Sequence, residues 1–166
     1  MMAPHAALPD IALPLHAPAA FGPPEYIEIE TRFGPISFKT ENAIEMPFGL
    51  PGFPGRRMFG LSAIADHKLD QFLLFQDLDD AKLCFLVLPL PIGNALLEAD
   101  DATEALETLG ISRANAALLL IVTLRQEQGG VVTSVNLRAP IILDTQRRIA
   151  RQYVMPNNKY AIRHAI

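Results

Sequence analysis

The sequence has little of several features that define whole classes of protein, beginning with cysteine and charge. Only 19% of the 166 residues are charged and 50% are apolar, which indicates a globular rather than a disordered chain of about one domain. One cysteine excludes an internal disulfide, and the apolar run KLCFLVL around Cys84 favours a buried small hydrophobe over a reactive thiol.

Long apolar runs are also absent. None approaches the roughly 20 residues that span a bilayer, so we expect no membrane association. The first residues, MMAPHAALPDIALPLHAP, have no positively charged region and are interrupted by proline, which argues against a secretory signal peptide. The expected location is therefore the cytoplasm.

Signatures of catalysis and of metal or cofactor binding are missing as well. There is no GxSxG motif, and no GK[ST] follows the glycines of residues 46–57. Asp79 and Asp80 could work as an acid and base pair, but their place between two strands favours a solvated turn. The histidines do not have the spacing of a metal-binding pair: His5, His16, His67 and His164. We expect no catalytic residue, no metal and no cofactor.

The net charge of −4 is unevenly distributed. Residues 66–107 carry ten acids against Lys68 and Lys82, whereas residues 147–166 carry five basic residues and no acid. These stretches could be two solvated faces, or the acidic one could attract a basic partner and repel phosphate backbones. The basic stretch contains Tyr153 and Tyr160 and superficially suits single-strand binding. Because the whole chain is acidic, protein binding fits better than direct nucleic-acid binding.

The chain divides into a tail and one domain. Residues 1–24 contain six prolines, a spacing that blocks helices and sheet interiors, and they are interpreted as a flexible Pro/Ala-rich tail. From Tyr26 the sequence YIEIETRF alternates apolar and charged residues, as a half-buried strand does. The domain is therefore assigned to residues 25–166.

Residues 46–57, MPFGLPGFPGRR, predict a rigid double turn. Proline followed by glycine fits the two central positions of a type II turn, and the pair occurs twice. The residues expected to fix turns in the chain are Gly49, Pro51, Gly52 and, further on, Pro140. The rings of Phe48 and Phe53 could seal the end of a barrel, the commoner use, or stand exposed as contacts. We expect Phe53 and Arg56 to face outward.

The remaining pattern predicts many short strands and one helix. MFGLSAI, QFLLFQD and KLCFLVL indicate strands, the last two joined by a hairpin-like LDDA connector. A helix is expected between Leu96 and Gly110, with Asp101 and Glu104 as an N-terminal cap pair and Leu106 facing inward. ALLLIVTLR predicts a strand buried on both sides, and VVTSVNL and IILD predict two more. The fold class is mainly all-β: a small antiparallel β-barrel-like domain, or a sandwich, with one short helical insert.

Several blocks of sequence occur in a characteristic order: FGPISF, EMPFGLPGFPGRRMFGL, FLLFQDLDDAKLCFLVLPLP, LLLIVTLR, TSVNLRAPIILDTQRRIARQ and KYAIRH. From about Arg32 onward, their order and spacing resemble the flagellar assembly factor FliW family. The motif GLPGF and the motif NLRAPI, which begins at Asn136, carry most of the resemblance. Asp77 stands where the family usually has a serine.

The resemblance implies a cytoplasmic β-barrel-like protein that is not an enzyme and has no cofactor. It implies chaperone-like binding of flagellin and antagonism of CsrA, the RNA-binding repressor of flagellin translation, with the two partners bound in alternation. Two other classes stay open: a flavin-binding split-barrel enzyme and a single-strand nucleic-acid-binding barrel.

Partner contacts are expected from three places. The double turn contributes its outward residues, the acidic turn its carboxylates, and the C-terminal segment a mobile amphipathic edge. Asn136 alternates opposite the face of Val135 and is expected to point away from the core unless both faces of the strand are covered. The predicted contact residues are Phe53, Arg56, Asp77, Asp79, Asp80, Asn136, Arg138, Tyr160, Arg163 and His164. We further expect that neutralising five aspartates, Asp77, Asp79, Asp80, Asp100 and Asp101, would weaken CsrA antagonism without unfolding the protein.

Overall fold

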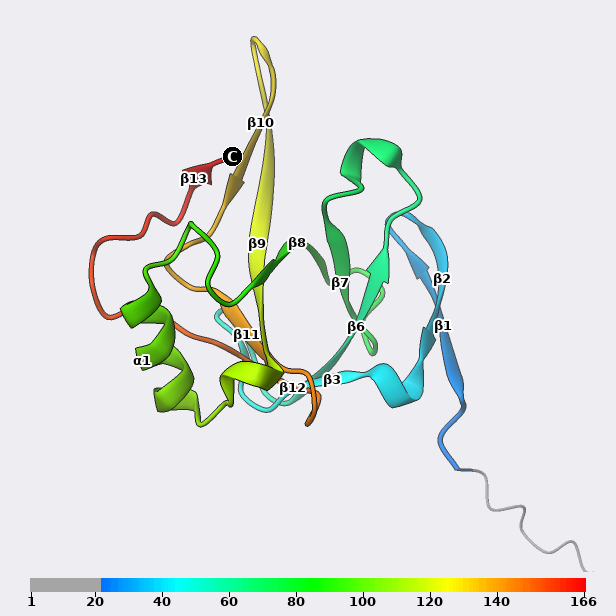
Figure 1. The fold of residues 1–166 in the computed structure, drawn as a ribbon. Coiled ribbons are helices and arrows are strands. Elements are labelled where there is room, and N and C mark those ends of the chain that lie inside the picture. Colours follow the sequence, from blue (N-terminus) through cyan, green and yellow to red (C-terminus); the bar gives the residue numbers. More distant parts are fainter. Residues whose placement is uncertain (1–21) are drawn as a thin grey trace, which may run out of the picture.

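A barrel of short strands forms the body of the molecule (Figure 1). The computed structural model describes residues 22–166, so nearly all of the predicted tail lies outside the described residues. The strands are β1 (Tyr26–Thr31), β2 (Gly34–Lys39), β3 (Ile44–Met46), β4 (Gly49–Leu50), β5 (Phe53–Pro54), β6 (Arg57–Ala63), β7 (Leu73–Asp77), β8 (Cys84–Pro91), β9 (Ala116–Glu127), β10 (Gly130–Val135), β11 (Ile141–Asp144), β12 (Ile149–Gln152) and β13 (His164–Ala165). The helices are α1 (Ala99–Leu109) and the short 3₁₀ turns η1 (Thr40–Asn42), η2 (His67–Leu69) and η3 (Arg113–Asn115).

The barrel closes through β9. Its strands follow the order β11, β12, β3, β6, β7, β8, β9, and a further pairing of β9 with β11 completes the ring. Every neighbouring pair is antiparallel except β12 and β3, which are parallel and meet at Ile149 and Glu45. The predicted all-β barrel with one helical insert is confirmed, with this parallel pair as a detail that the strand pattern did not show.

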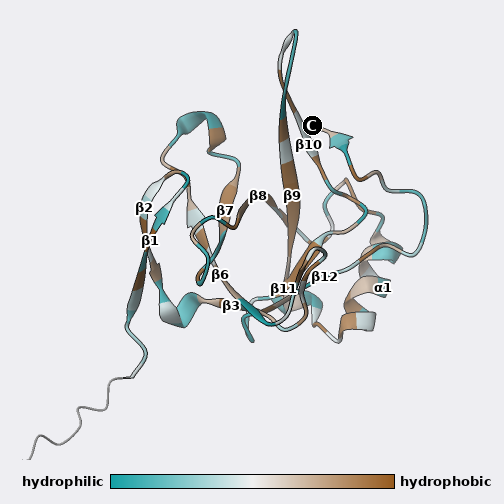
Figure 2. Cartoon of the chain, turned by 180° about the vertical axis from the view of Figure 1, so that it is seen from behind, coloured by the Kyte–Doolittle hydropathy of each residue, from teal (hydrophilic) through white to brown (hydrophobic). Residues whose placement is uncertain are grey.

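Two hydrophobic cores lie on the two sides of the barrel wall. All seven barrel strands contribute to the inner core, in which the rings of Phe59 and Phe75 stack with centroids 4.2 Å apart. The outer core includes Leu74 and Leu120 of the wall together with Leu106 of α1. Figure 2 shows the corresponding hydrophobic colour along β8 and the lower part of β9. The two cores explain why several strands read as continuous apolar runs.

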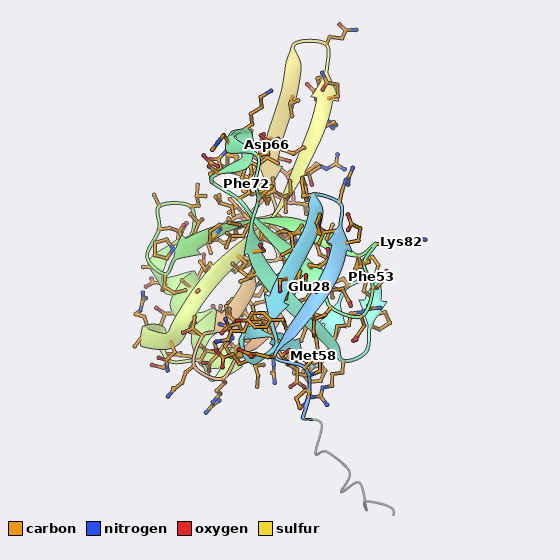
Figure 3. The ribbon with its side chains drawn as sticks, turned by 90° about the vertical axis from the view of Figure 1, so that its right-hand side faces the viewer. Glu28, Phe53, Met58, Asp66, Phe72 and Lys82 are labelled. Carbon is orange, nitrogen blue, oxygen red and sulfur yellow. The ribbon has the colours of Figure 1, made fainter. Side chains whose placement is uncertain are left out.

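The β1–β2 hairpin packs on the outside of the barrel, in front of it in Figure 3. Gly34 at its turn has φ of 96°, a conformation that glycine adopts without strain. Phe38 of this hairpin is buried and lies directly on Gly60 of β6, where any side chain would overlap its ring. Glycine at position 60 therefore allows the hairpin to approach the sheet closely.

The helix forms as predicted at its C-terminal end and differently at its N-terminal end. Gly110 ends α1 in the left-handed conformation, with φ of 65°. The N-cap is Glu98, without a side-chain cap, so the predicted cap pair of Asp101 and Glu104 is wrong. Asp101 instead contacts the C-terminal segment of the chain. Its partners are too distant in sequence for a local capping pattern to reveal.

Strand β9 is longer than predicted and only partly buried. Residues Leu118, Leu119 and Leu120 are fully buried, but residues 123–127 are exposed and form with β10 a hairpin that projects from the body (Figure 1). The prediction of burial on both sides is therefore wrong for the second half of this strand.

No helix among residues 22–166 is long and apolar enough to cross a membrane.

Candidate partner-binding surfaces

The double turn of residues 49–55 forms a small hairpin, as its sequence predicts. Strands β4 and β5 pair antiparallel around Pro51 and Gly52, and Gly52 has φ of 85°. Gly49 has φ of 67°, and a side chain there would overlap the carbonyl oxygen of Phe53. Glycine is thus required at position 49 for two independent reasons.

Both phenylalanines of this hairpin region stand exposed rather than sealing the barrel. Phe48 is 71% exposed and Phe53 37%, whereas Leu50 between them is buried in the inner core. The Arg151 guanidinium lies 4.9 Å from the centre of the Phe48 ring. Cation–π contacts of this kind restrict an exposed ring to a defined position. We call Phe48, Phe53, Arg56 and Arg151 the hairpin surface.

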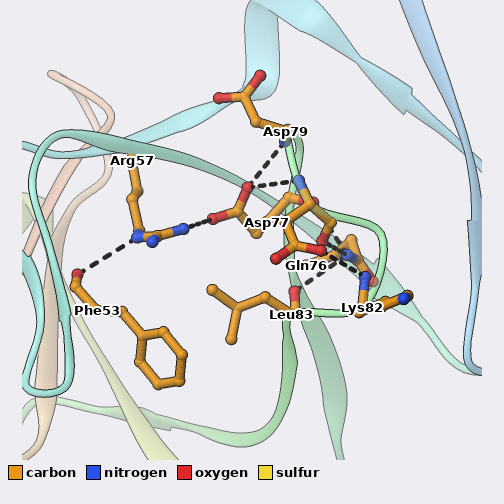
Figure 4. A network of polar contacts seen from close by, with 8 residues as sticks. Phe53, Arg57, Gln76, Asp77, Asp79, Lys82 and Leu83 are labelled. Carbon is orange, nitrogen blue, oxygen red and sulfur yellow. Dashed lines mark hydrogen bonds and ion pairs between the residues drawn. The ribbon is translucent and has the colours of Figure 1, made fainter.

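Phe53 is held by a network of polar contacts that joins the half-buried Arg57 to the buried Asp77 (Figure 4). Arg57 lies 5.7 Å from the centre of its ring and donates from Nε to its carbonyl oxygen at 3.3 Å. The same guanidinium donates from Nη1 to Asp77 Oδ2 at 2.8 Å. The Phe53 ring also meets Phe85 edge to face, with centroids 6.0 Å apart. The exposed Phe53 ring is therefore held in place by contacts with Arg57 and Phe85 that exist before any partner binds.

Asp77 is one of the buried residues that support Phe53 from below and is not exposed on the surface. It is only 1% exposed, and its Oδ1 accepts the backbone N–H groups of Asp79 at 2.8 Å and Asp80 at 3.0 Å. The prediction that Asp77 contacts a partner is therefore wrong, because Arg57 and the turn occupy its carboxylate. Asp79 and Asp80 remain exposed at the tip of the turn.

Gln76 fixes the same turn from the opposite side. Its side chain is fully buried, and Nε2 donates to the carbonyl oxygens of Asp77, Asp80 and Leu83 at 2.9, 3.0 and 3.1 Å. These bonds tie the 77–83 turn across its base. In Figure 3, Lys82 of this turn lies on the same side of the molecule as Phe53. The acidic turn and the hairpin surface are thus neighbours on one side of the barrel.

The C-terminal segment is anchored to α1 instead of forming a free edge. Tyr160 is buried, donates its O–H to the Asp101 carboxylate and accepts the Glu98 N–H at 3.0 Å. Lys159 Nζ lies 2.7 Å from Glu98 Oε2 and 3.2 Å from Asp101 Oδ2. Asn157 donates to Asp101 Oδ1 at 3.0 Å. We call these five residues the Asp101 cluster.

The cluster shifts the pKa of its members. The Tyr160 O–H, assisted by Lys159 and Asn157, holds the pKa of Asp101 below its usual value. Burial and the neighbouring Asp101 carboxylate raise the pKa of Tyr160. The hydrogen bonds to Glu98 and Asp101 raise the pKa of Lys159. At neutral pH these pKa shifts favour a charged Asp101, a neutral Tyr160 and a charged Lys159, which are the states that form the hydrogen bonds of the cluster.

The expected mobile C-terminal edge is therefore wrong for Tyr160, and the other predicted residues there have different positions. His164 is half-buried and pairs with Val135 where β13 joins β10, whereas Arg163 is exposed beside Arg125. Asn136 is half-buried and uses its Oδ1 to accept the Ala139 N–H at 3.0 Å. Its predicted outward orientation gives way to a local turn that leads into Pro140.

The ten predicted contact residues, which were expected from three places, do not all remain on the surface of those places. Phe53, Arg56, Asp79 and Asp80 share the side that carries the hairpin surface, and Arg56 pairs there with Glu45 at 2.8 Å. Arg138 instead contacts Asn158 at 3.2 Å in the C-terminal part.

Among residues 22–166, no group of three or more His, Cys, Asp or Glu side chains could hold a metal.

Comparison with known proteins identifies the family. The sequence model described as FliW protein matches residues 28–166, which include the barrel, the hairpin surface and the Asp101 cluster. The chain belongs to the FliW family. Arg57 and Arg151 of this FliW-family chain were not among the predicted contact residues, and an exposed Phe48 was only one of two alternatives. Arg57 ends the turn motif of residues 46–57 and could have been considered on that ground.

Individual relatives agree with the family match. The flagellar assembly factor FliW of Geotalea uraniireducens (strain Rf4) is 36% identical over 138 residues, covering 81% of this chain and 80% of that protein. That of Syntrophus aciditrophicus (strain SB) is 31% identical over 137 residues, covering 82% and 84%. A crystal structure of the flagellar assembly factor FliW superposes with a TM-score of 0.63 at 25% identity, over 83% of this chain and 95% of that one.

The two adjacent arginines of the turn provide a matched test of the buried network. Replacing Arg57 in Arg57→Ala leaves the Asp77 carboxylate buried without its partner, and we expect a loss of about 3 kcal/mol in the free energy of unfolding. Arg56→Ala removes a solvent-exposed ion pair and should cost less than about 1 kcal/mol. Urea denaturation of both variants measures the difference. Equal losses would show that Asp77 does not depend on Arg57.

The Asp101 cluster predicts a pH dependence of stability. Because the folded-state pKa of Asp101 is depressed, its contribution is present above the ordinary aspartate pKa of about 3.9 and is lost as pH falls through the folded value. Asp101→Asn should therefore be less stable than the parent protein at pH 7 but equally stable near pH 2. Asp100→Asn, an exposed neighbour outside the cluster, is the control. The test is the denaturation midpoint of each variant, measured between pH 2 and 7. If the midpoints of the parent and of Asp101→Asn change with pH in parallel, the stabilising role of the Asp101 carboxylate is contradicted.

Proposed function

We propose that this chain acts in flagellar assembly by binding flagellin in a chaperone-like manner and by antagonising the translational repressor CsrA when flagellin is not bound. The observation that carries the proposal is the FliW match over residues 28–166, together with relatives named as flagellar assembly factors. On this proposal the protein works in the cytoplasm, is not an enzyme and binds no nucleic acid directly.

The hairpin surface supports a role in protein binding. Two exposed phenylalanine rings are each held by a guanidinium, so little side-chain freedom is lost when a partner covers them. Aromatic and arginine side chains are also the types that contribute most to protein interfaces. The glycines at 49 and 52 fix the backbone beneath them. We assign this surface to flagellin.

The acidic side chains that remain exposed support a separate contribution to CsrA antagonism. Asp79 and Asp80 lie at the tip of the 77–83 turn, and Asp100 lies in the first turn of α1. Negative charge brought beside an RNA-binding protein raises the cost of an approaching phosphate chain, and more so at low salt. Asp77 and Asp101 do not belong to this set, because their carboxylates hold the fold together.

Flagellin binding is tested first with purified flagellin monomer. The double variant Phe48→Ser, Phe53→Ser should bind at least about tenfold more weakly than the parent, because it removes both rings of the hairpin surface. The matched control is Val154→Ser, Ile162→Ser, which removes two apolar side chains of similar exposure elsewhere. Affinities measured by calorimetry give the answer. A parent protein that fails to bind flagellin would overturn the proposed function, and an unaffected double variant would exclude the hairpin surface.

CsrA antagonism is tested with a corrected set of acidic positions. The triple variant Asp79→Asn, Asp80→Asn, Asp100→Asn should fold normally and release CsrA-bound RNA less effectively than the parent, with the difference shrinking as salt is raised. An RNA mobility-shift assay at two salt concentrations measures it. Glu28→Gln, Glu30→Gln, Glu127→Gln is the control for general loss of negative charge. Equal antagonism by parent and triple variant would reject the electrostatic contribution.

A further inference from the structure

Strands β8 and β9 pair for only part of their length. Their register joins Pro91 to Ala117, Leu88 to Leu120 and Val87 to Ile121, where the pairing stops. Continued, the same register would place Leu86 opposite Val122 and Cys84 opposite Leu124. Neither pair forms, although all four residues belong to regular strands. In Figure 1, β9 rises away from β7 and β8 at this point.

The separated strands face each other with backbone groups that lack a strand partner. The Asn136 N–H bonds to the Ile121 carbonyl, so Ile121 and every second residue after it direct their backbone toward β10. The backbone groups of Val122, Leu124 and Gln126 therefore face the β8 side. Within the described part of the chain, no strand pairs with this edge.

The facing edge of β8 is free in the same way. The Asp77 N–H bonds to the Leu83 carbonyl, which directs the odd-numbered residues of β8 toward β7. Cys84 and Leu86 therefore direct their backbone groups toward β9, beyond the last pair that the two strands make. Two sheet edges thus border one opening, which we call the notch.

The notch is lined mainly by apolar side chains. A cleft of about 420 Å³ lies here, and its lining includes Phe33, Leu69, Leu86, Val122 and Leu124. Leu124 is 40% exposed in spite of its position in a strand. Burial raises the pKa of the Cys84 thiol in the same cleft, in keeping with its apolar surroundings. Apolar lining beside unpaired backbone groups is the combination that an added β-strand uses.

One positively charged side chain stands at the rim. Arg32 is exposed, lines the same cleft and makes no ion pair with any residue of 22–166. A partner segment with an acidic residue would complement it. The N-terminal residues of this chain are a poor candidate, because their prolines lack the N–H groups that strand pairing needs.

We propose that the notch binds an extended segment of the partner protein as an additional strand on the free edge of β9. The segment carries apolar side chains at alternate positions, which enter the cleft, and an acidic side chain that pairs with Arg32. This inference rests on the proposed function in one respect, namely that flagellin supplies the segment. The notch would then add specificity for an extended conformation to the contacts of the hairpin surface.

The test uses the full-length chain and flagellin monomer. Leu124→Pro removes an N–H that faces the notch without removing a β9–β10 hydrogen bond, and it should weaken flagellin binding about tenfold more than Leu124→Ala, which keeps the N–H. Arg32→Glu should weaken binding by a similar factor, whereas Arg113→Glu, an exposed arginine elsewhere, should not. Circular dichroism verifies that each variant is folded.

Hydrogen exchange provides a readout that does not depend on variants. The amides of Val122, Leu124 and Gln126 should exchange rapidly in the free protein and slowly in the flagellin complex. A complex that forms while these amides stay fast, or that tolerates both Leu124→Pro and Arg32→Glu, would overturn the notch but leave the proposed function intact. Failure of the parent protein to bind flagellin would overturn the proposed function and, with it, flagellin as the source of the segment.

Two other occupants would also overturn the proposal, and each leaves its own signature. If a second copy of the chain fills the notch, the free protein sediments as a dimer that Leu124→Pro converts to a monomer. If the chain's own N-terminal part fills it, the three amides are slow in the free protein and become fast when residues 1–21 are deleted. A monomer with fast amides supports a partner segment.

Discussion

Both hydrophobic cores meet at β9. Leu119 points into the barrel and packs with Phe75, while Leu118 and Leu120 point outward toward α1 and the C-terminal segment. The same strand closes the ring, since it pairs with β8 along one edge and with β11 along the other. Closing a barrel leaves no free sheet edge among its members where pairing is complete. The closure, the outer core and the projecting hairpin all depend on the path of this one strand.

The path of β9 also determines which backbone N–H and C=O groups have no strand partner. Over its first half the strand has partners on both edges, and over its second half only β10 remains. The notch is therefore a consequence of how the barrel ends, and it requires no separate structural element. The hairpin surface arises differently, from a two-residue turn that keeps Leu50 inside the barrel and leaves Phe48 and Phe53 outside.

The sequence predicts what depends on neighbours along the chain. Alternation in YIEIET gave β1, proline followed by glycine gave the turn at 51 and 52, and Gly110 gave the end of α1. Burial of Asp77 was missed because its partner, Arg57, comes from another strand, 20 residues earlier. Tyr160 resembled a fraying terminus because Asp101 is 59 residues away. The notch could not be predicted for the same reason. The sequences of β8 and β9 each have a regular strand pattern, and the notch exists only because the two strands separate after Val87 and Ile121.

The parallel contact between β12 and β3 has a consequence for how the protein is made. Ile149 and Glu45 form the sole register pair between these two strands within the described part of the chain. Because β12 is the last of the seven barrel strands along the sequence, the ring stays open until Ile149–Gln152 have been synthesised. Until then Ile44 and Met46 cannot be covered from that side. A chain in which β12 has not yet paired with β3 therefore exposes apolar side chains of the inner core, a state that is prone to aggregation.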